Sequence, residues 1–514
     1  ANWGHYYHCH DDGAKLVFNW DYSDSHVCSK CGKAWSGEPF DSARVFHVHK
    51  QLGIQARSLA ALWLIKGDLA DALEAKRILL GYAEHYKDFQ VHGDIPYNGP
   101  GKLFAQTLDE AHWIIDICMA YDFIAEQLDT SEQQRIQEGL LQPCAAFLIE
   151  HKEEQLHNHS LWITSAIGCL GIVLQDEEIM KAGMEGRYGF LDQVERGTLE
   201  DGFWYEGSMH YHVYSLHAVI QLGLFTEGSS WDIRNHSMIK RMFNFPLDFI
   251  LHDGTFPIAN DMHPNFGLKD AALIFEVAWD WYGEDKFAQI LQSPFVGDSA
   301  RASFDSMLFG RQEKSGELSM TPVSVSSQPS GLAVLVNSNG LELVAKHSPF
   351  GGEHDHMDRL GLSLRKGACP IFVDPGTTAY GVPVHYGWFK HTFSHNTICI
   401  ESKDQPPTDG ELMQFHQEDW GAWCEGQVKW NPDFDYKMKD CIILPEHNVS
   451  WDRDIYRNVE IRRFNMIQDD ILVDVVKVSG IAGKQVDLLF HMNGNLVDTE
   501  RWFITNDRIC ELSA

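Results

Sequence analysis

Residues 51–86, QLGIQARSLAALWLIKGDLADALEAKRILLGYAEHY, set the architecture of the first half of the chain. Apolar residues recur in this stretch at i, i+3, i+4 and i+7, which is the pattern of an amphipathic helix. Gly67-Asp68 interrupts the pattern and predicts a short turn. The stretch therefore predicts a helical hairpin, with one helix over residues 51–66 and the other over residues 69–86.

The same helical pattern continues to about residue 310. Further helices are predicted at residues 103–124, 130–151, 159–174, 177–196, 214–225, 237–251, 268–282 and 286–292. Thr130 and Gln133 have the spacing of a capping box at one of these helix starts. About ten consecutive helices without intervening strands indicate a curved helical array or an (α/α) toroid, whose concave face suits a long polymer.

The composition changes after residue 310. Residues 311–330, RQEKSGELSMTPVSVSSQPS, are polar and rich in Ser and Pro, which predicts a linker. Beyond it, Asn339-Gly340 predicts a type I′ hairpin turn. Strand-like runs lie at residues 332–336, 341–346, 360–364, 397–401, 459–468, 472–476 and 486–492. Residues 331–514 are therefore predicted to form an antiparallel β-sandwich, and its strand-like end leads us to expect a C-terminal truncation.

Together these patterns predict an α+β multidomain protein. We expect a small N-terminal β cap over residues 1–41, an (α/α) toroid over 42–310, a linker over 311–330 and the sandwich over 331–514. In the cap, Cys9 and the run Cys28-Ser29-Lys30-Cys31-Gly32 resemble a zinc knuckle. A fourth ligand would come from His5, His10 or His26, and the metal would stabilise the cap. The alternative is a set of free thiols in a β-hairpin.

Composition limits the classes of partner. The net charge of −32 argues against nucleic acid, because phosphate binding needs a basic face. An acidic protein also repels acidic sugars at long range, so a cleft for them must be locally basic. No segment reaches the roughly 20 apolar residues of a membrane span, so we expect no membrane partner. The chain begins at Ala1 without a signal-peptide pattern, and an export signal is expected to be removed or absent. The oligomeric state is left open.

The segment Gly351-Gly352-Glu353-His354-Asp355-His356-Met357-Asp358 carries the densest polar chemistry of the second half. On an extended strand alternate residues share one face. His354, His356 and Asp358 are therefore expected to point toward one place. The alternative is that they are surface residues in a chain that contains 27 histidines.

Two further elements extend this cluster. Asp374 follows a β-rich stretch, and residues 391–397 read HTFSHNT. We predict that His356, Asp374 and His395 surround one cation, because zinc accepts nitrogen and oxygen ligands of this kind. His391 is a competing ligand to His395.

The helical half carries a second polar cluster. Asn158 and His159 precede a buried helix, where they could hold a substrate carboxylate or transfer a proton; alternatively Asn158 is only a helix cap. Residues 201–214, DGFWYEGSMHYHVY, form a Gly-rich aromatic stretch of the kind that stacks on sugar rings. Tyr214 follows His159 by about one helical hairpin, so the two can reach one cleft. The residues predicted to contact substrate are Trp162, Trp204, Tyr205, Glu206, Tyr211 and Tyr386.

Taken together, these motifs resemble the heparinase II/III-like polysaccharide lyases. The nearest group is the exolytic oligo-alginate and heparin lyases of polysaccharide lyase family 15, whose N-terminus is also similar to residues 3–7 and 37–39. The resemblance covers nearly the whole chain in the family's order. It implies an (α/α) toroid joined to a β-sandwich, with the active site between them and a structural zinc in the sandwich.

The resemblance also implies roles for single residues. Tyr214 would be the acid/base, with Tyr211 as its competitor, and Tyr386 would add a hydroxyl group. Asn158 and His159 would flank the substrate carboxylate, and His354 would be the second catalytic histidine. The implied zinc ligands are His356, Asp374 and His395.

The implied reaction is β-elimination, which yields a 4,5-unsaturated uronate. We predict exolytic cleavage of heparin or heparan sulfate-type oligosaccharides, for which Arg359, Lys366 and Lys390 would supply basic groups, with oligo-alginate as the alternative substrate. A glycoside hydrolase using Glu206 and Asp261 and a non-catalytic glycan-binding protein are the competing classes. A metal-dependent amidohydrolase does not fit, since its His-x-His motif lies near the N-terminus. We expect the protein in the bacterial periplasm or secreted, with the cytoplasm as the alternative.

Overall fold

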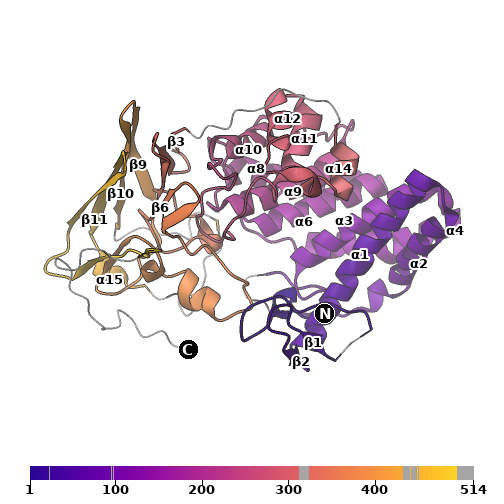
Figure 1. Cartoon of the computed structure of the whole chain (residues 1–514). Helices are drawn as coiled ribbons and strands as arrows, with labels where there is room; N and C mark the ends of the chain where they lie inside the picture. Colours follow the sequence, from indigo (N-terminus) through magenta and orange to yellow (C-terminus); the bar gives the residue numbers. More distant parts are fainter. Residues whose placement is uncertain are drawn as a thin grey trace. The chain divides into compact units, whose positions relative to one another are not determined.

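The computed structural model describes residues 1–21, 24–93, 95, 98–311, 323–431, 440–441, 449 and 451–494. A helical N-terminal region precedes a C-terminal region of antiparallel sheets, as predicted (Figure 1). Most of the predicted linker and the last residues of the predicted sandwich lie outside the described part. Across the described ranges, no helix has both the length and the apolar composition needed to cross a membrane.

The chain divides into two compact units that do not follow the predicted boundaries. The first unit contains residues 1–197, 215–239 and 379–382, and the second contains residues 198–214, 240–378 and 383–514. The later helices of the predicted toroid therefore belong to the same unit as the sheets. The division also passes through a helix, α9, between Tyr214 and Ser215.

The first unit is built mainly from helices. Its elements are η1 (Gly4–Tyr6), β1 (His26–Val27), β2 (Ala34–Trp35), α1 (Phe40–Lys66), α2 (Leu69–His85), η2 (Tyr86–Asp88), α3 (Thr107–Phe123), η3 (Ala125–Gln127), α4 (Thr130–Ile136), η4 (Gln137–Leu141), α5 (Gln142–Glu150), α6 (Asn158–Leu174), α7 (Glu177–Met184) and α8 (Phe190–Gly197). The predicted hairpin is present as α1 and α2. Gly67 ends α1 with φ 70°, and the Asp68 side chain caps α2 by accepting from the Ala70 amide at 3.0 Å.

Helix α1 begins at Phe40, well before the predicted start at residue 51. Phe40 and Ala43 pack in one apolar cluster with Cys9 and Cys28 of the N-terminal cap. The helix therefore extends to the cap because the cap buries its first turns, which the periodicity of α1 alone does not reveal.

Two other predicted helices are interrupted. Residues 130–151 form α4, the π-helical turn η4 and α5, because Gly139 in η4 lies so close to Ala83 that a Cβ atom would be 2.3 Å from its carbonyl oxygen. Residues 177–196 are split into α7 and α8 at Gly186, with φ 76°. The capping box of α4 is formed by Asp129 and Glu132, one residue before the predicted pair Thr130 and Gln133.

Helix α6 is the most buried helix of the first unit and packs against α3 and α7. Small residues permit this close packing. A Cβ atom on Gly168 would lie 2.6 Å from Leu222, and one on Gly171 would lie 2.7 Å from Met180. The N-terminal end of α6, which carries Asn158 and His159, is therefore held by a rigid element.

The second unit contains the remaining helices and the sheets. Its helices are α10 (Ser237–Asp248), α11 (Ala272–Tyr282), α12 (Asp285–Leu291), α13 (Gly297–Ala300), α14 (Phe304–Phe309) and α15 (Arg453–Tyr456), and α9 (Met209–Thr226) begins in it. The short helices are η5 (Gly352–His354), η6 (His385–Phe389) and η7 (Thr392–Ser394). Helix α9 starts at Met209, before the predicted residue 214, so Tyr211 and Tyr214 lie one turn apart on it.

The sheets are antiparallel. One has the order β3 (Val325–Ser327), β4 (Leu332–Val336), β5 (Leu341–Lys346), β6 (Leu362–Lys366) and β7 (Cys369–Phe372). Another has the order β12 (Ile471–Ser479), β11 (Glu460–Gln468), β10 (Gly421–Lys429) and β9 (Gly410–Glu418), and β13 (Val486–Leu488) pairs with β8 (Ile398–Ile400). Side chains of the five- and four-stranded sheets share one apolar core.

The sequence prediction needs three corrections in this region. Strand β3 pairs with β4, so the sheet begins inside the segment predicted as a linker. Strands β9 and β10 were not predicted, because β9 is largely exposed and β10 buries small residues such as Ala422 and Cys424. The hairpin at Asn339-Gly340 is present, but only Gly340 of this pair has a positive φ, at 77°, so its turn is not type I′.

Candidate active site and metal centre

The candidate site of the second unit is organised around the buried carboxylate of Asp261. His354 Nδ1 lies 3.0 Å from Asp261 Oδ2, and His356 Nε2 lies 2.9 Å from Oδ1. Lys390 Nζ donates to Oδ2 at 2.6 Å, and the Thr377 hydroxyl donates to Oδ1 at 3.1 Å. Burial alone would raise the pKa of Asp261, but Lys390 and the surrounding histidines hold it well below its usual value. Asp261 is therefore a permanent anion that orients two histidines.

The two histidines do not reach Asp261 by strand alternation, as the sequence suggested. Gly352 has φ 79° and begins the 3₁₀ turn η5, which ends at His354. The residues up to Gly361 are not in a strand. The turn brings His354 and His356 to the same carboxylate. The predicted extended strand over these residues is therefore wrong.

His354 is also in contact with the aromatic face of α9. The rings of Tyr211 and His354 are stacked, with centroids 3.5 Å apart and an interplanar angle of 15°. Tyr214 lies next to Tyr211, with ring centroids 6.0 Å apart in an edge-on arrangement. Both tyrosines are half-buried, whereas His212 and Val213 between them are buried. The site thus combines an oriented imidazole with two phenols on one helical face.

A second group of donors lies beside His356. His395 Nδ1 is 3.2 Å from Asp374 Oδ2 and 3.9 Å from Asp358 Oδ2, and ligand atoms of these three residues lie within 4.8 Å of one another. His356 Nδ1 lies 3.2 Å from the other nitrogen of His395, Nε2. The structure therefore groups Asp358 with Asp374 and His395, while the ligand role of His356 stays a prediction. His391, the competitor, instead pairs with Asp404 at 2.7 Å.

The carboxylates of this group create an environment that favours positive charge. Burial would lower the pKa of His395, but the carboxylates of Asp374 and Asp358 raise it above its usual value. Burial would raise the pKa of Asp374, but His395 lowers it to about 2. Asp358 Oδ2 is buried and accepts no hydrogen bond from any residue that the structure describes. Buried oxygen and nitrogen donors with an unused carboxylate oxygen are suited to zinc.

The basic residues expected to recognise sulfate are occupied. Lys390 is 1% exposed and bound to Asp261. Arg359 is 2% exposed and donates to Asp355 and to the Ser348 carbonyl oxygen. Lys366 is exposed and pairs with Asp470 at 2.7 Å. Lys390 and Arg359 therefore serve the folded protein, whereas Lys366 takes part only in an exposed ion pair.

In the first unit, Asn158 is buried as the first residue of α6, and His159 is partly exposed with Nδ1 3.5 Å from Glu153 Oε1. Asn158 does not have the helix-cap position proposed as its alternative role, because His157 occupies it. Trp162 contacts His112, with ring centroids 4.0 Å apart. It lines a cavity of about 160 Å³ together with Lys50.

The aromatic stretch before α9 is more buried than a sugar platform requires. Trp204 is fully buried, and its contact with substrate stays a prediction. Tyr205 packs against Phe350 and Met357, and Glu206 is buried with Oε2 3.9 Å from His354 Nε2. Tyr386 is half-buried beside His385, with ring centroids 4.5 Å apart, and burial raises its pKa. Of the predicted contacts in this unit, Glu206 and Tyr211 lie directly at His354.

The sequence is similar to known proteins over most of its length. A family model described as Heparinase II/III-like, C-terminal matches residues 320–507, and one described as Alginate lyase matches residues 100–256. An exo-oligoalginate lyase of Saccharophagus degradans is 25% identical over 493 residues, which are 88% of this chain and 64% of that protein. An alginate lyase of Stenotrophomonas maltophilia is 24% identical over 503 residues, again 64% of its length.

These matches support membership of the heparinase II/III-like superfamily.

Solved structures agree with this membership in fold. A crystal structure of heparinase III matches the heparinase II/III-like chain with a TM-score of 0.59 and 15% identity, over 87% of this chain and 65% of the other. The heparan sulfate lyase of Pedobacter heparinus matches with a TM-score of 0.53 and 13% identity, over 88% and 66%. The chain thus spans about two thirds of the length of these relatives, and the structural likeness concerns the fold alone.

Sequence reasoning missed part of the site of this heparinase II/III-like chain. It named Asp261 only as a hydrolase carboxylate and gave Asp358 no separate ligand role. It did not name Asn260, whose side chain donates to the Glu206 carbonyl oxygen at 3.0 Å and accepts from the His356 amide at 3.3 Å. The signal was the adjacent pair Asn260-Asp261. Asn260 has φ 59°, a conformation that asparagine adopts more readily than most residues.

Proposed function

We propose that the chain is a polysaccharide lyase that cleaves uronate-containing oligosaccharides by β-elimination. The observation that carries the proposal is the oriented His354, fixed by Asp261 and stacked on Tyr211 one turn from Tyr214. An imidazole and phenols on rigid elements can transfer protons without a water nucleophile. The matches to an alginate lyase family model and to an exo-oligoalginate lyase support the same reaction and its exolytic mode.

The elimination has defined requirements. The C5 proton of a uronate lies α to the carboxylate, so its removal develops negative charge on the carboxylate oxygens. The C5–H electron pair forms the C4=C5 double bond as the C4–O4 bond breaks. A base takes the C5 proton, an acid protonates O4, and no water is consumed.

We assign these roles to named side chains. Tyr214 is the acid/base, and His354, with Nδ1 directed to Asp261, acts through its Nε2 side. Tyr211 orients His354 by stacking and contacts substrate. Asn158 and His159 keep their predicted role as donors to the substrate carboxylate.

Alginate-type oligomers fit these observations better than sulfated ones. Arg359 and Lys390 are buried and engaged by protein carboxylates, so they do not supply sulfate pockets. The two curated relatives described above are named for alginate. An alginate uronate requires only that its carboxylate be neutralised.

A glycoside hydrolase is less consistent with the site. Such an enzyme needs one carboxyl group that stays protonated until it donates to the leaving oxygen. Asp261 has its pKa held well below the usual range and is saturated by donors from His354, His356, Lys390 and Thr377. It is therefore unsuited to act as the acid.

The proposal includes the finer fold implied by the resemblance. The shared core of the four- and five-stranded sheets supports a β-sandwich, and the consecutive helices α1 to α6 support an (α/α) toroid. Export to the periplasm or the medium fits an enzyme that acts on a polymer.

We also propose a structural zinc at Asp358, Asp374 and His395, with His356 beside them. When bound, the metal would order the loops that carry His354 and His356. The donor set and the unused Oδ2 of Asp358 support this site. The metal takes no part in the proposed reaction, whose proton transfers are carried out by side chains alone.

His395→Ala is expected to lose one zinc per chain and to lower the free energy of unfolding by about 3 kcal/mol, since it removes the imidazole that pairs with the Asp374 carboxylate. Metal analysis and thermal melting measure both effects. His391→Ala is the matched control, because His391 pairs with Asp404 away from this group. Zinc retained in His395→Ala and lost in His391→Ala would reverse the assignment.

Lys50→Ala tests the cavity beside Trp162. A lysine and a tryptophan on one cavity wall suit an acidic sugar ring. We expect KM to rise by about tenfold or more with little change in kcat, because a charge-assisted hydrogen bond contributes about 1.5–3 kcal/mol. Lys66→Ala, at the exposed end of α1, is the control. An unchanged KM in Lys50→Ala would remove this cavity from the substrate path.

A substrate panel tests the proposed function itself. Alginate, heparan sulfate, heparin, hyaluronan and chondroitin oligomers are incubated with the protein and followed by near-ultraviolet absorbance and mass spectrometry. We expect alginate oligomers to give an unsaturated product that absorbs in the near ultraviolet. The masses of the two cleavage products should add up to the mass of the substrate. Carboxyl-reduced alginate should not react. Products heavier by one water would indicate a hydrolase instead.

A further inference from the structure

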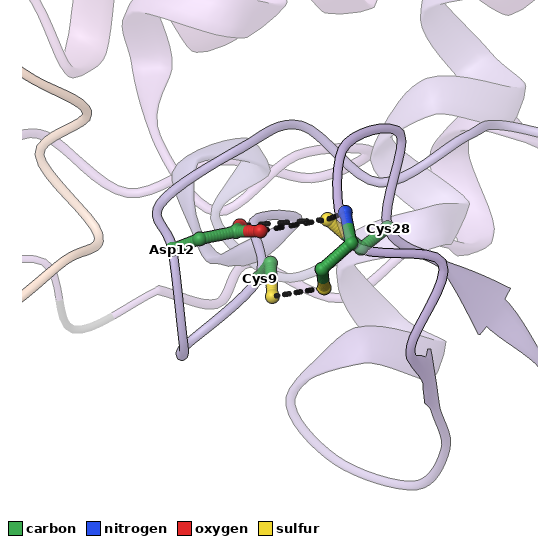
Figure 2. A group of neighbouring side chains, drawn as sticks. Cys9, Asp12 and Cys28 are labelled. Carbon is green, nitrogen blue, oxygen red and sulfur yellow. Dashed lines mark hydrogen bonds between the residues drawn. The ribbon is translucent and has the colours of Figure 1, made fainter.

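The N-terminal cap brings three cysteines and one aspartate together. Ligand atoms of Cys9, Asp12, Cys28 and Cys31 lie within 4.8 Å of one another. Figure 2 shows the side chains of Cys9, Asp12 and Cys28 directed toward one another from two loops. This site lies in the first unit and takes no part in the proposed elimination. The expected histidine ligands are elsewhere: His26 bonds to Tyr7 and Asp41, and His10 packs on Trp35 and Phe40.

The two loops repeat one pattern in sequence and in backbone geometry. Residues 9–13 read Cys-His-Asp-Asp-Gly, and residues 28–32 read Cys-Ser-Lys-Cys-Gly. In each loop the glycine amide donates to the carbonyl oxygen of the first cysteine, at 2.9 Å and 3.2 Å, and the glycine has φ 68° or 73°. The amide of that cysteine then bonds to the residue after the glycine, at 2.8 Å in both loops. Asp12 thus occupies in the first loop the place of Cys31 in the second.

The distances match a tetrahedral metal. Two sulfurs that are each about 2.3 Å from zinc lie about 3.8 Å apart in a tetrahedron, and a sulfur and an oxygen lie about 3.5 Å apart. Cys9 Sγ and Cys31 Sγ are 3.8 Å apart. Cys28 Sγ lies 3.4 Å from Asp12 Oδ1 and 3.5 Å from Oδ2. The four side chains already have the spacing of a ligand set, and a sulfur–sulfur distance of 3.8 Å is not that of a disulfide.

Backbone donors favour a thiolate at Cys28. The amides of Lys30 and Cys31 both donate to Cys28 Sγ, at 3.3 Å and 3.4 Å. Cys9 is fully buried and Cys28 is 3% exposed, and buried thiolates need a nearby cation. The strands of the cap, β1 and β2, have two residues each, so the cap contains little regular secondary structure.

We propose that Cys9, Asp12, Cys28 and Cys31 bind a structural zinc ion, held by a C-x-x-D-G loop and a C-x-x-C-G loop. The metal fixes both loops and supports the apolar cluster in which Cys9 and Cys28 pack against Phe40 and Ala43 of α1. Zinc is the ion that three thiolates and one carboxylate select in a closed tetrahedral site. The site is independent of the proposed zinc at His395 and of the lyase reaction.

Cobalt substitution separates this site from the one at His395. Full-length protein is stripped with a chelator under reducing conditions and titrated with Co²⁺. We expect a thiolate-to-cobalt charge-transfer band in the near ultraviolet and intense visible bands of tetrahedral cobalt. A site made of His and Asp cannot give the thiolate band. Absence of this band overturns the proposal.

Substitutions at accessible ligands provide the second test. Cys31 is exposed, so Cys31→Ser is expected to fold; it should lower the intensity of the thiolate band, because Cys9 and Cys28 remain, and weaken zinc binding at this site by at least about tenfold. Asp12→Asn keeps a side-chain oxygen that can accept from the Ala14 amide, as Asp12 does at 3.0 Å, and should also weaken zinc binding. Cys369→Ser, at another exposed cysteine, is the control. Equal zinc content and melting temperature in Cys31→Ser and Cys369→Ser would contradict the proposal.

Thiol labelling gives a readout on the unmodified protein. Cys369 should react quickly whether or not a chelator is present, whereas Cys31 should react slowly until the chelator removes zinc. Peptide mass spectrometry measures both in one sample. Fast labelling of Cys31 without chelator, or a disulfide that includes Cys9, Cys28 or Cys31 in the protein as purified, would overturn the site.

Discussion

Tyr214→Phe is expected to lower kcat/KM on alginate oligomers by about 10²- to 10⁴-fold, which is the usual contribution of a positioned acid/base. The substitution removes one hydroxyl group and keeps the ring beside Tyr211. Folding should persist, and oligosaccharide binding should change little, because the lost group acts in the transition state. Initial rates from near-ultraviolet absorbance, together with binding by calorimetry, measure the two effects separately.

Tyr211→Phe is the matched control for this prediction. It removes a hydroxyl from the same helical face but keeps an aromatic ring that can stack on His354. A smaller loss is expected. If Tyr211→Phe is the inactive variant and Tyr214→Phe keeps full activity, the acid/base is Tyr211 and the assignment of Tyr214 is wrong.

Asp261→Asn is expected to destabilise the protein by about 3–5 kcal/mol, because it leaves a buried cation without its counter-charge. Lys390 is 1% exposed and 2.6 Å from this carboxylate. Activity should fall by at least about tenfold as well, since the asparagine amide offers only one acceptor oxygen to the two histidines that Asp261 orients. Chemical denaturation and initial rates test the two parts.

The pH dependence of this effect has a definite sign. The pKa of Asp261 is lower in the folded protein than its usual value, so its stabilisation is fully present above the usual carboxyl pKa and is lost as the pH falls toward the folded one. Wild type and Asp261→Asn should therefore differ most near neutral pH and converge in acid. Asp419→Asn, at an exposed position, is the control. Equal stability of wild type and Asp261→Asn at neutral pH would contradict the role of Asp261.

Much of the fold could be predicted where one face of an element is apolar. The hairpin α1–α2 and strands β4 and β5 follow their periodicity, with β4 and β5 at the predicted residues. Errors arose where tertiary contacts override the local pattern. The approach of Gly139 to Ala83 accompanies a π-helical turn, and the N-terminal cap extends α1.

The sequence predicted several residues of the candidate site but not which of them contact one another. The polar motif identified His354, His356, Asp374 and His395, because imidazole and carboxylate groups rarely cluster without a purpose. Asp261, the common partner of His354 and His356, lies about a hundred positions earlier, and only the folded chain brings it to them. The same limit applies to Asp12, whose C-x-x-D-G spacing becomes informative beside the second loop.

The central claim is that the chain breaks the glycosidic link by removing the C5 proton, without water. Cleavage of alginate oligomers in water labelled with heavy oxygen tests this most directly, read by mass spectrometry and corrected for slow exchange at reducing ends. The account predicts an unsaturated product and no heavy oxygen from the cleavage step. Heavy oxygen incorporated with each cleavage, and no rise in near-ultraviolet absorbance, would contradict it.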